Sequence, residues 1–244
     1  VNVQTGAVEM SIGKGQEVVT CVALSLDDSM IVTGSQDNSV ALYSLQYTPG
    51  APRISERRTL YGHDGAVTCV SINKEMDLVC SGSQDGTIIL YSLSDATYLR
   101  TIYDANYDKR LPSMPAISWC GVTNEGNVVW YSQSDFKFHL YSSMGQKLLE
   151  KEMNSQLNTI TFSNDRQYII AGGDKILLFM MRIYDFALVT PTIEEHFGGE
   201  GRPASFTQVP NLRVAVRSVS PSLDSQYIFL GLENGEICVV AVKM

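Results

Sequence analysis

Residues 65–93, GAVTCVSINKEMDLVCSGSQDGTIILYSL, repeat residues 17–45, EVVTCVALSLDDSMIVTGSQDNSVALYSL, without a gap. Both stretches contain the strings VTCV, GSQD and LYSL at a constant offset of 48 positions (65 − 17). Agreement over this length indicates an internal repeat. A repeat of this period is the first feature to establish, because it decides the fold.

Three weaker copies follow, at residues 115–143, 157–181 and 212–244. Each has an alternating apolar strand, a polar turn, a second strand ending in small residues, a tight turn and a third apolar strand. A more polar strand, such as ATYLRTI, comes fourth. Four short antiparallel strands at a period of roughly 40–50 residues are typical of a β-propeller blade. The sequence therefore predicts an all-β propeller with five visible four-stranded antiparallel blades.

The turns between the second and third strands carry their own signal. The dipeptides Asp85-Gly86 and Asn234-Gly235 tolerate positive φ at both positions, as two-residue hairpin turns require. We therefore expect a two-residue turn at each of these places.

A single domain, residues 1–244, accommodates all the units, with an incomplete blade at its start. Residues 1–12, VNVQTGAVEMSI, read as the end of a third strand, a turn and a fourth strand. Two interpretations stay open. Either this strand completes the last unit, which has room for three strands, and closes a small ring, or the chain begins partway through a blade of a larger ring. The first residue, Val1, favours a piece of a longer protein.

The composition favours a soluble globular protein of the cytoplasm. Apolar residues are 44% and charged residues 18% of the chain, and the longest apolar run, residues 176–181, is far too short to cross a membrane. The net charge of −8 disfavours nucleic acid as a partner, because its phosphates would be repelled. The five cysteines lack C-x-x-C spacing and are expected to be reduced thiols of the core.

The units resemble WD40 repeats, in which a Gly-His pair, a Ser or Thr, a turn Asp and a Trp form a hydrogen-bonded network. The matching residues of the second unit are His63, Ser81, Asp85 and Tyr91, with tyrosine in the tryptophan position. The resemblance implies a structural role for them. A buried carboxylate needs donors, which a His N–H and a Ser O–H supply. The other units lack the Gly-His pair, so this network is expected to be complete in one unit alone.

No catalytic residue, metal ligand or cofactor is predicted. A Ser-His-Asp set invites comparison with a hydrolase triad, but a serine in the middle of a structural network is no exposed nucleophile beside an oxyanion hole. The three histidines are scattered and lack the spacing of metal ligands. The expected first residues of the innermost strands are apolar, which disfavours chemistry in a central channel: Val19, Val67, Ile117, Ile160 and Val216.

Within the WD40 class, the chain resembles the C-terminal propeller of BEACH-domain proteins, the neurobeachin-like family. The resemblance rests on YGHDGAVTCVSINKEMDLVCSGSQDG, GNVVWYSQSDFKFHLYSSMGQKLLEKEMNS, TITFSNDRQYIIAGGD and IFLGLENGEICVVAV. It implies a propeller that follows a BEACH domain in a large cytosolic scaffold acting in vesicle and membrane trafficking, peripheral on endomembranes. Membrane association is then expected at most indirectly, through the rest of the protein.

These observations predict a non-catalytic scaffold that binds other proteins, because recognition concentrates in loops held on a rigid frame. Long loops are expected at residues 46–59, 103–114 and 190–212. Their charged residues are the candidate contacts: Arg53, Arg57, Arg58, Lys109, Arg110, Glu194 and Glu195. Two alternatives remain, a phosphoinositide-binding propeller that uses the Arg57-Arg58 pair and a propeller-fold hydrolase.

Overall fold

The described part of the chain contains twenty β-strands joined by turns. The computed structural model describes residues 11, 17–48, 51–104, 115–153, 156–174, 178–189, 192–194 and 214–243. No helix long and apolar enough to cross a membrane occurs among these residues. In unit order the strands are β1 (Val19–Leu24), β2 (Met30–Ser35), β3 (Val40–Thr48), β4 (Ala51–Leu60); β5 (Val67–Asn73), β6 (Leu78–Ser83), β7 (Thr87–Ser92), β8 (Thr97–Tyr103); β9 (Ile117–Val122), β10 (Val128–Ser132), β11 (Lys137–Tyr141), β12 (Lys147–Glu152); β13 (Leu157–Phe162), β14 (Tyr168–Gly173), β15 (Phe179–Arg182), β16 (Leu188–Val189); and β17 (Thr192–Glu194), β18 (Val216–Pro221), β19 (Tyr227–Leu232), β20 (Ile237–Lys243).

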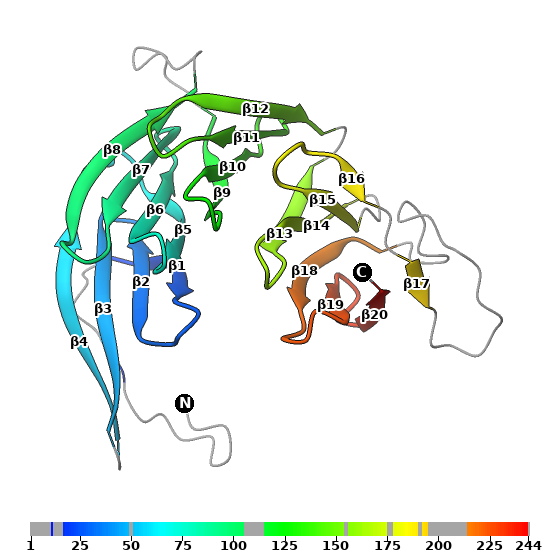
Figure 1. Cartoon of the computed structure of the whole chain (residues 1–244), viewed down its shortest axis with the longest axis horizontal. Coiled ribbons are helices and arrows are strands. Elements are labelled where there is room, and N and C mark those ends of the chain that lie inside the picture. Colours follow the sequence, from blue (N-terminus) through cyan, green and yellow to red (C-terminus); the bar gives the residue numbers. More distant parts are fainter. Residues whose placement is uncertain are drawn as a thin grey trace. The chain divides into compact units, whose positions relative to one another are not determined.

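The strands form five four-stranded antiparallel sheets, which we call blades 1 to 5 (Figure 1). Blades 1 to 4 follow the chain, with β1 to β4, β5 to β8, β9 to β12 and β13 to β16 in that order across each sheet. Blade 5 has the order β17-β20-β19-β18. The prediction of an all-β propeller fold with five four-stranded blades is confirmed.

The chain divides into two compact units. Unit 1 comprises Val1–Ser134 and Tyr141–Lys147, and it contains blades 1 and 2 with β9 and β10. Unit 2 comprises Asp135–Leu140 and Leu148–Met244, and it contains blades 4 and 5 with most of β11 and β12.

Neighbouring blades within a unit are joined by a repeated polar contact at the start of the first strand. The register between the first and second strands shifts there, which leaves one bulged residue: Thr20, Thr68 or Asn158. Each bulged side chain donates a hydrogen bond to the carbonyl oxygen of the residue that begins β5, β9 or β18 in the next blade, which is Val67, Ile117 or Val216 respectively. A bulge re-aims a side chain out of the regular alternation, so this one can reach the neighbouring blade.

A glycine in the second strand receives that same first residue. The pairs are Gly34 with Val67, Gly82 with Ile117, and Gly172 with Val216. A Cβ added at any of the three glycines would lie 2.5–2.6 Å from the next blade's side chain, closer than packed atoms approach. The small residues at the end of the second strand are therefore needed for close packing between blades.

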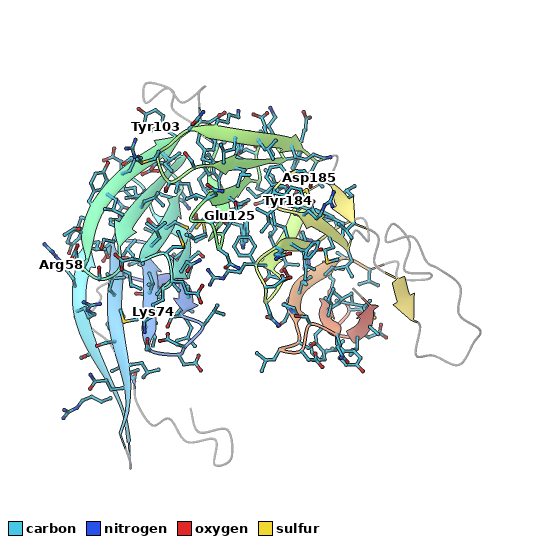
Figure 2. All side chains as sticks on the ribbon, in the orientation of Figure 1. Arg58, Lys74, Tyr103, Glu125, Tyr184 and Asp185 are labelled. Carbon is cyan, nitrogen blue, oxygen red and sulfur yellow. The ribbon has the colours of Figure 1, made fainter. Side chains whose placement is uncertain are left out.

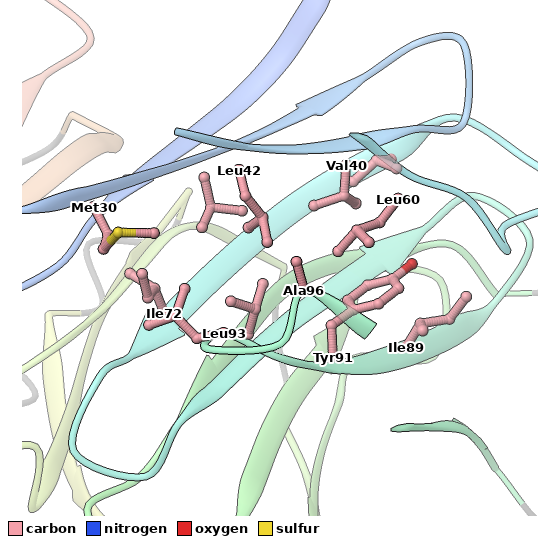
Figure 3. Close-up of a cluster of buried hydrophobic side chains, with 12 residues drawn as sticks. Met30, Val40, Leu42, Leu60, Ile72, Ile89, Tyr91, Leu93 and Ala96 are labelled. Carbon is pink, nitrogen blue, oxygen red and sulfur yellow. The ribbon is translucent and has the colours of Figure 1, made fainter. Parts of the chain in front are cut away.

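An apolar layer fills the space between blades 1 and 2 (Figure 3). Blade 1 contributes Met30, Val32, Val40 and Leu42, and blade 2 contributes Ile72, Val79, Ile89, Tyr91 and Leu93. In both blades these residues come from one side of the alternating strands, which is why the period of two in the sequence predicts them well.

The predicted two-residue turns are wrong in detail. Gly86 and Gly235 have positive φ, at 78° and 86°, but Asp85 and Asn234 do not. The Gly86 N–H donates to the Ser83 carbonyl over 3.2 Å, so four residues form the turn and a left-handed residue closes it. In blade 1 Asn38 takes this position with φ 70°, since asparagine tolerates the left-handed region.

Within the expected loop at residues 46–59, residues 46–48 and 51–59 lie in strands. They belong to a long hairpin in which β3 and β4 pair as far as Thr48 and Ala51, and Figure 1 shows it running past β1 and β2. The polar composition misled the prediction, because an edge strand outside the core can be polar on both faces. Arg53, Arg57 and Arg58 therefore lie on β4, the outer strand of blade 1.

The expected loop at residues 190–212 contains a strand. β17 pairs with β20, with Ile193 opposite Val242, and is the outer strand of blade 5 next to β20. It comes before β18, β19 and β20 in the chain, whereas the outer strands of blades 1 to 4 come last. Glu194 is the last residue of β17. Lys109, Arg110, Glu195 and the first ten residues, with their proposed ring-closing strand, lie outside the described residues.

Candidate functional site

Blade 2 contains a closed hydrogen-bonded network around His63. This residue lies between β4 and β5, and its side chain is fully buried. Ser81 Oγ donates to His63 Nε2 over 2.7 Å, and His63 Nδ1 lies 3.2 Å from Asp85 Oδ2. Because a carboxylate can only accept, the Nδ1 proton points to Asp85 and the Nε2 lone pair points to Ser81. The structure thus brings together three of the four residues that the WD40 resemblance indicated.

Asp85 is the central acceptor of this network. Its carboxylate also accepts the Asp64 N–H over 2.8 Å, the Thr87 N–H over 2.8 Å and the Thr87 hydroxyl over 2.6 Å. Burial would raise the pKa of Asp85, but the hydrogen bonds from His63 and Thr87 outweigh it and lower that pKa to about 2. The charged carboxylate therefore ties the segment before β5 to the hairpin between β6 and β7.

Gly62 and Tyr91 border the network without joining it. Gly62 has φ 153°, and a Cβ there would lie 3.0 Å from Ile89 Cδ1, which explains why glycine precedes the histidine. The Tyr91 hydroxyl is buried and has no hydrogen-bond partner within the described part of the chain. Burial raises the pKa of Tyr91 to about 12. The tyrosine in the tryptophan position acts in packing between blades 1 and 2 (Figure 3).

Sequence reasoning missed Thr87, whose signal was the Asp-x-Ser/Thr spacing in the turn. Its hydroxyl and N–H both donate to Asp85, as a side chain two residues beyond an aspartate can in such a turn. Ser39 stands in the same place in blade 1, where its N–H donates to Asp37 over 3.0 Å. The aspartate turn therefore recurs in blade 1.

Asp135 and Asp174 lie in the turns between the second and third strands of blades 3 and 4, and each makes a different contact within unit 2. Asp174 accepts from Asn158 Nδ2 over 2.6 Å. Asp135 Oδ2 lies 3.9 Å from His139 Nε2, while Glu150 Oε2 lies 3.9 Å from the opposite ring nitrogen. Two carboxylates on opposite sides of one imidazole do not converge on a common ligand position, so this trio has no metal-site geometry.

Arg57 and Arg58 bind the main chain of the neighbouring blade. Arg57 is the bulged residue of β4, and it donates to the Leu93 carbonyl over 3.2 Å and the Ser94 carbonyl over 2.9 Å. Arg58, labelled in Figure 2, donates to the Ala96 carbonyl over 3.1 Å. The two guanidinium groups thus hold the turn between β7 and β8 against blade 1, and they serve the fold of unit 1.

Replacing Arg57 by alanine is expected to lower the free energy of unfolding of unit 1 by about 1 kcal/mol, because two carbonyl groups lose a charged donor at a partly exposed site. The two tryptophans, Trp119 and Trp130, lie in unit 1 and report its unfolding in urea by fluorescence. Arg53→Ala on the same strand is the control and should change stability by less than about 0.5 kcal/mol. Equal effects of the two variants would contradict the assigned role of Arg57.

All five cysteines are free thiols, and three of them are buried. Cys80 Sγ lies 3.5 Å from Cys120 Sγ between blades 2 and 3 in unit 1. Burial raises the pKa of Cys120 well above its usual range, and it raises the pKa of Cys21 to about 11. Cys120 and Cys21 are therefore protonated at neutral pH, so neither of these two thiols is set up as a nucleophile.

The chain matches two family models and a curated relative over much of its length. The family model described as "Neurobeachin beta propeller domain" matches residues 52–203, more than half of the chain. The model described as "WD domain, G-beta repeat" matches residues 9–44. One curated relative, "BEACH domain-containing protein B" of Arabidopsis thaliana, is 28% identical over 193 residues, which cover 72% of this chain and 7% of the relative. The chain therefore spans only a small part of that relative's length, and by its repeats, its blades and the matched model it belongs to the neurobeachin β-propeller family.

Proposed function

We propose that this chain is a non-catalytic protein-interaction module, the propeller of a larger BEACH-type protein acting in membrane trafficking. The family match supports the module, and the BEACH-domain relative supports the larger context. The proposed location is the cytoplasm, peripheral on endomembranes, with membranes reached through other parts of the protein. Proteins are the proposed partners, and the net charge of −8 argues against nucleic acid.

The burial of the His63 network is the observation that supports a non-catalytic function. Ser81 is 0% exposed, and its hydroxyl proton is already given to His63 Nε2. A nucleophilic serine must be reachable by a substrate carbonyl beside donors for the oxyanion. A closed network with a structural carboxylate meets neither condition.

The long hairpin of β3 and β4 is the proposed contact region for protein partners. β3 has nine residues and β4 has ten, whereas β7 and β8 at the same place in blade 2 have six and seven. The extra length is not needed to cover the blade, and Gln46 and Arg53 near its end are exposed. An extended hairpin with exposed polar side chains and an outer strand at the edge of its sheet is a recognised way to bind other proteins.

The two alternative functions have less support. A phosphoinositide site would use Arg57 and Arg58, and both guanidinium groups already donate to carbonyl oxygens of blade 2. A hydrolase in a central channel would need polar residues at the first strands, which begin with apolar residues: Val19, Val67, Ile117, Leu157 and Val216. The fourth of these strands begins three residues earlier than expected from the sequence, and the apolar character is unchanged.

A paired variant tests the hairpin. The double variant Gln46→Ala/Arg53→Glu is expected to lose the proteins that wild type captures in quantitative affinity purification from cells, by about tenfold, with the urea midpoint unchanged. Lys151→Glu, which reverses a charge on β12 and leaves the hairpin intact, is the control. Capture of the same proteins by wild type and the double variant would overturn the hairpin as the contact region.

Binding to lipid vesicles distinguishes a protein-binding module from a phosphoinositide-binding propeller. Vesicles of phosphatidylcholine with a phosphorylated phosphatidylinositol are expected to retain neither wild type nor the double variant. Retention of wild type that disappears at high salt would instead support a headgroup site, because contacts with phosphates are screened by salt.

A further inference from the structure

Two buried thiols meet at the joint between blades 2 and 3, within unit 1. Cys80 lies in β6 and Cys120 in β9, and the two residues are 0% and 3% exposed. Cys120 Sγ lies 3.5 Å from Cys80 Sγ and 3.9 Å from the Cys80 carbonyl oxygen. The two sulfur atoms are therefore in contact between two blades, although they are 40 positions apart in the chain.

The preceding joint, between blades 1 and 2, has valines at the corresponding positions. Val32 stands 48 positions before Cys80 in the repeat (80 − 32). Val70 and Cys120 each lie two residues beyond the bulged residue of their strand. Val32 is buried in the apolar layer between blades 1 and 2, and Val70 packs against that layer. The fold can thus fill these positions with aliphatic side chains, so packing alone does not require a sulfur atom on both sides of the joint.

Cys69 is a third cysteine of the same apolar cluster, and it borders Cys120 as well. Its position is shared by both units of the strong repeat, because Cys21 stands 48 positions earlier (69 − 21). A cysteine there is therefore a property of the repeat, whereas Cys80 and Cys120 are particular to the joint between blades 2 and 3. Cys69 is the competing thiol from which this pair must be distinguished.

A disulfide between Cys80 and Cys120 requires a small movement. The sulfur atoms have to approach from 3.5 Å to about 2.05 Å, and rotations about the two Cα–Cβ bonds move sulfur atoms over such distances. β6 is hydrogen-bonded to β5 and β7, and β9 to β10, so the backbone holds the two thiols next to each other. Groups held in this way react as if they were at a high local concentration.

We propose that Cys80 and Cys120 form a redox-modified pair, which hydrogen peroxide oxidises to a disulfide that links blade 2 to blade 3. In a reducing compartment such a disulfide is transient, because thiol reductants return it to two thiols once the oxidant is removed. The linkage makes the packing of these two blades depend on the supply of oxidant.

The chemistry needs no group beyond the two thiols and the peroxide. The thiolate of the first cysteine attacks one peroxide oxygen, an S–O bond forms while the O–O bond breaks, and the departing hydroxide takes up the proton which that thiol released. The second sulfur then attacks the sulfenic sulfur, and the S–S bond forms as the hydroxyl group leaves as water with the proton of the second thiol. The two thiols are oxidised, and the peroxide is reduced to water.

Burial makes this oxidation slow. It raises the pKa of the Cys120 thiol well above its usual range, so the folded joint keeps this group protonated. Reaction requires a local opening that admits water and peroxide, and oxidation should therefore need sustained exposure. Once formed, the disulfide closes a loop of 40 positions and restricts the unfolded chain, so unit 1 should resist urea more strongly.

Peptide mapping of oxidised wild type tests the proposal and needs no variant. The folded chain is treated with hydrogen peroxide, the remaining thiols are alkylated, and the digest is analysed by mass spectrometry without reduction. We expect the 80–120 peptide pair as the main linkage, and its loss on treatment with dithiothreitol. The urea midpoint of the tryptophan signal should rise on oxidation and return on reduction, because both tryptophans lie in unit 1.

Two variants separate this pair from its neighbours. Cys80→Val/Cys120→Val carries the valines of the preceding joint, and peroxide should leave its urea midpoint unchanged. Cys69→Ala removes the competing thiol and should keep the 80–120 linkage. The proposal is overturned by absence of that linkage from folded wild type, by a 69–120 linkage in its place, or by a midpoint that rises equally in Cys80→Val/Cys120→Val.

Discussion

Asp85→Ala is expected to lower the free energy of unfolding of unit 1 by about 3 kcal/mol at pH 7. The substitution removes the acceptor for the Asp64 N–H, the Thr87 N–H and His63 Nδ1, and the imidazole of His63 is itself fully buried. Urea denaturation followed by tryptophan fluorescence measures the loss, because both tryptophans lie in unit 1.

The same variant should change the dependence of stability on pH. The pKa of Asp85 is lowered in the folded chain to about 2, below its ordinary value of 3.8. A group with a depressed pKa stabilises the fold above the unfolded value, and this contribution is lost as the pH falls from about 4 toward 2. The difference between wild type and Asp85→Ala should therefore shrink over that interval.

Asp37→Ala is the matched control for this prediction. Asp37 occupies the same turn position 48 residues earlier and accepts from Ser39, and the structure describes no histidine in contact with it. Its loss should cost about 1 kcal/mol, as for one local turn contact. Equal losses for the two aspartates would show that the His63 network adds nothing to the turn itself.

The repeat explains how much of blade 2 could be read from sequence. An offset of 48 fixes which residues share a place, so the strands and core sides follow from identities. The grouping of His63, Ser81 and Asp85 came from the resemblance to WD40 repeats, because the first unit has Gly15 where the second has His63. Tyr91 shows the limit of that reasoning. Its position was right, but whether its hydroxyl forms a hydrogen bond depends on fractions of an ångström that no sequence pattern contains.

What could not be predicted depends on pairing between distant segments. β17 joins β20 across about 50 positions, and three polar-flanked residues give no periodic signal for it. The bulge that re-aims Arg57 toward Leu93 is likewise a matter of register, so a basic stretch that reads as a binding loop proves to be a clamp between blades. Charge in a sequence shows that a residue is costly to bury, but not whether it faces solvent or a carbonyl oxygen.

Gly82→Ala is expected to destabilise unit 1 by about 2–4 kcal/mol, although it adds a single methyl group. The new Cβ would lie 2.6 Å from Ile117 Cγ2 on one side and 2.7 Å from Cys69 Sγ on the other. Both neighbours are buried between blades 2 and 3, so neither can move without displacing a packed core. The loss is measured as a shift of the urea midpoint of the tryptophan signal.

Gly231→Ala places the same methyl group at the same position of the repeat, but on β19 of blade 5, where Ser218 supplies the near contacts among the described residues. Its nearest neighbour is the Ser218 hydroxyl, the end of an exposed side chain that can rotate away, so stability should change by less than about 0.5 kcal/mol. A large loss of stability in Gly231→Ala would mean that the glycine serves its own strand, and it would remove the argument that glycine at this position exists to receive a neighbouring blade.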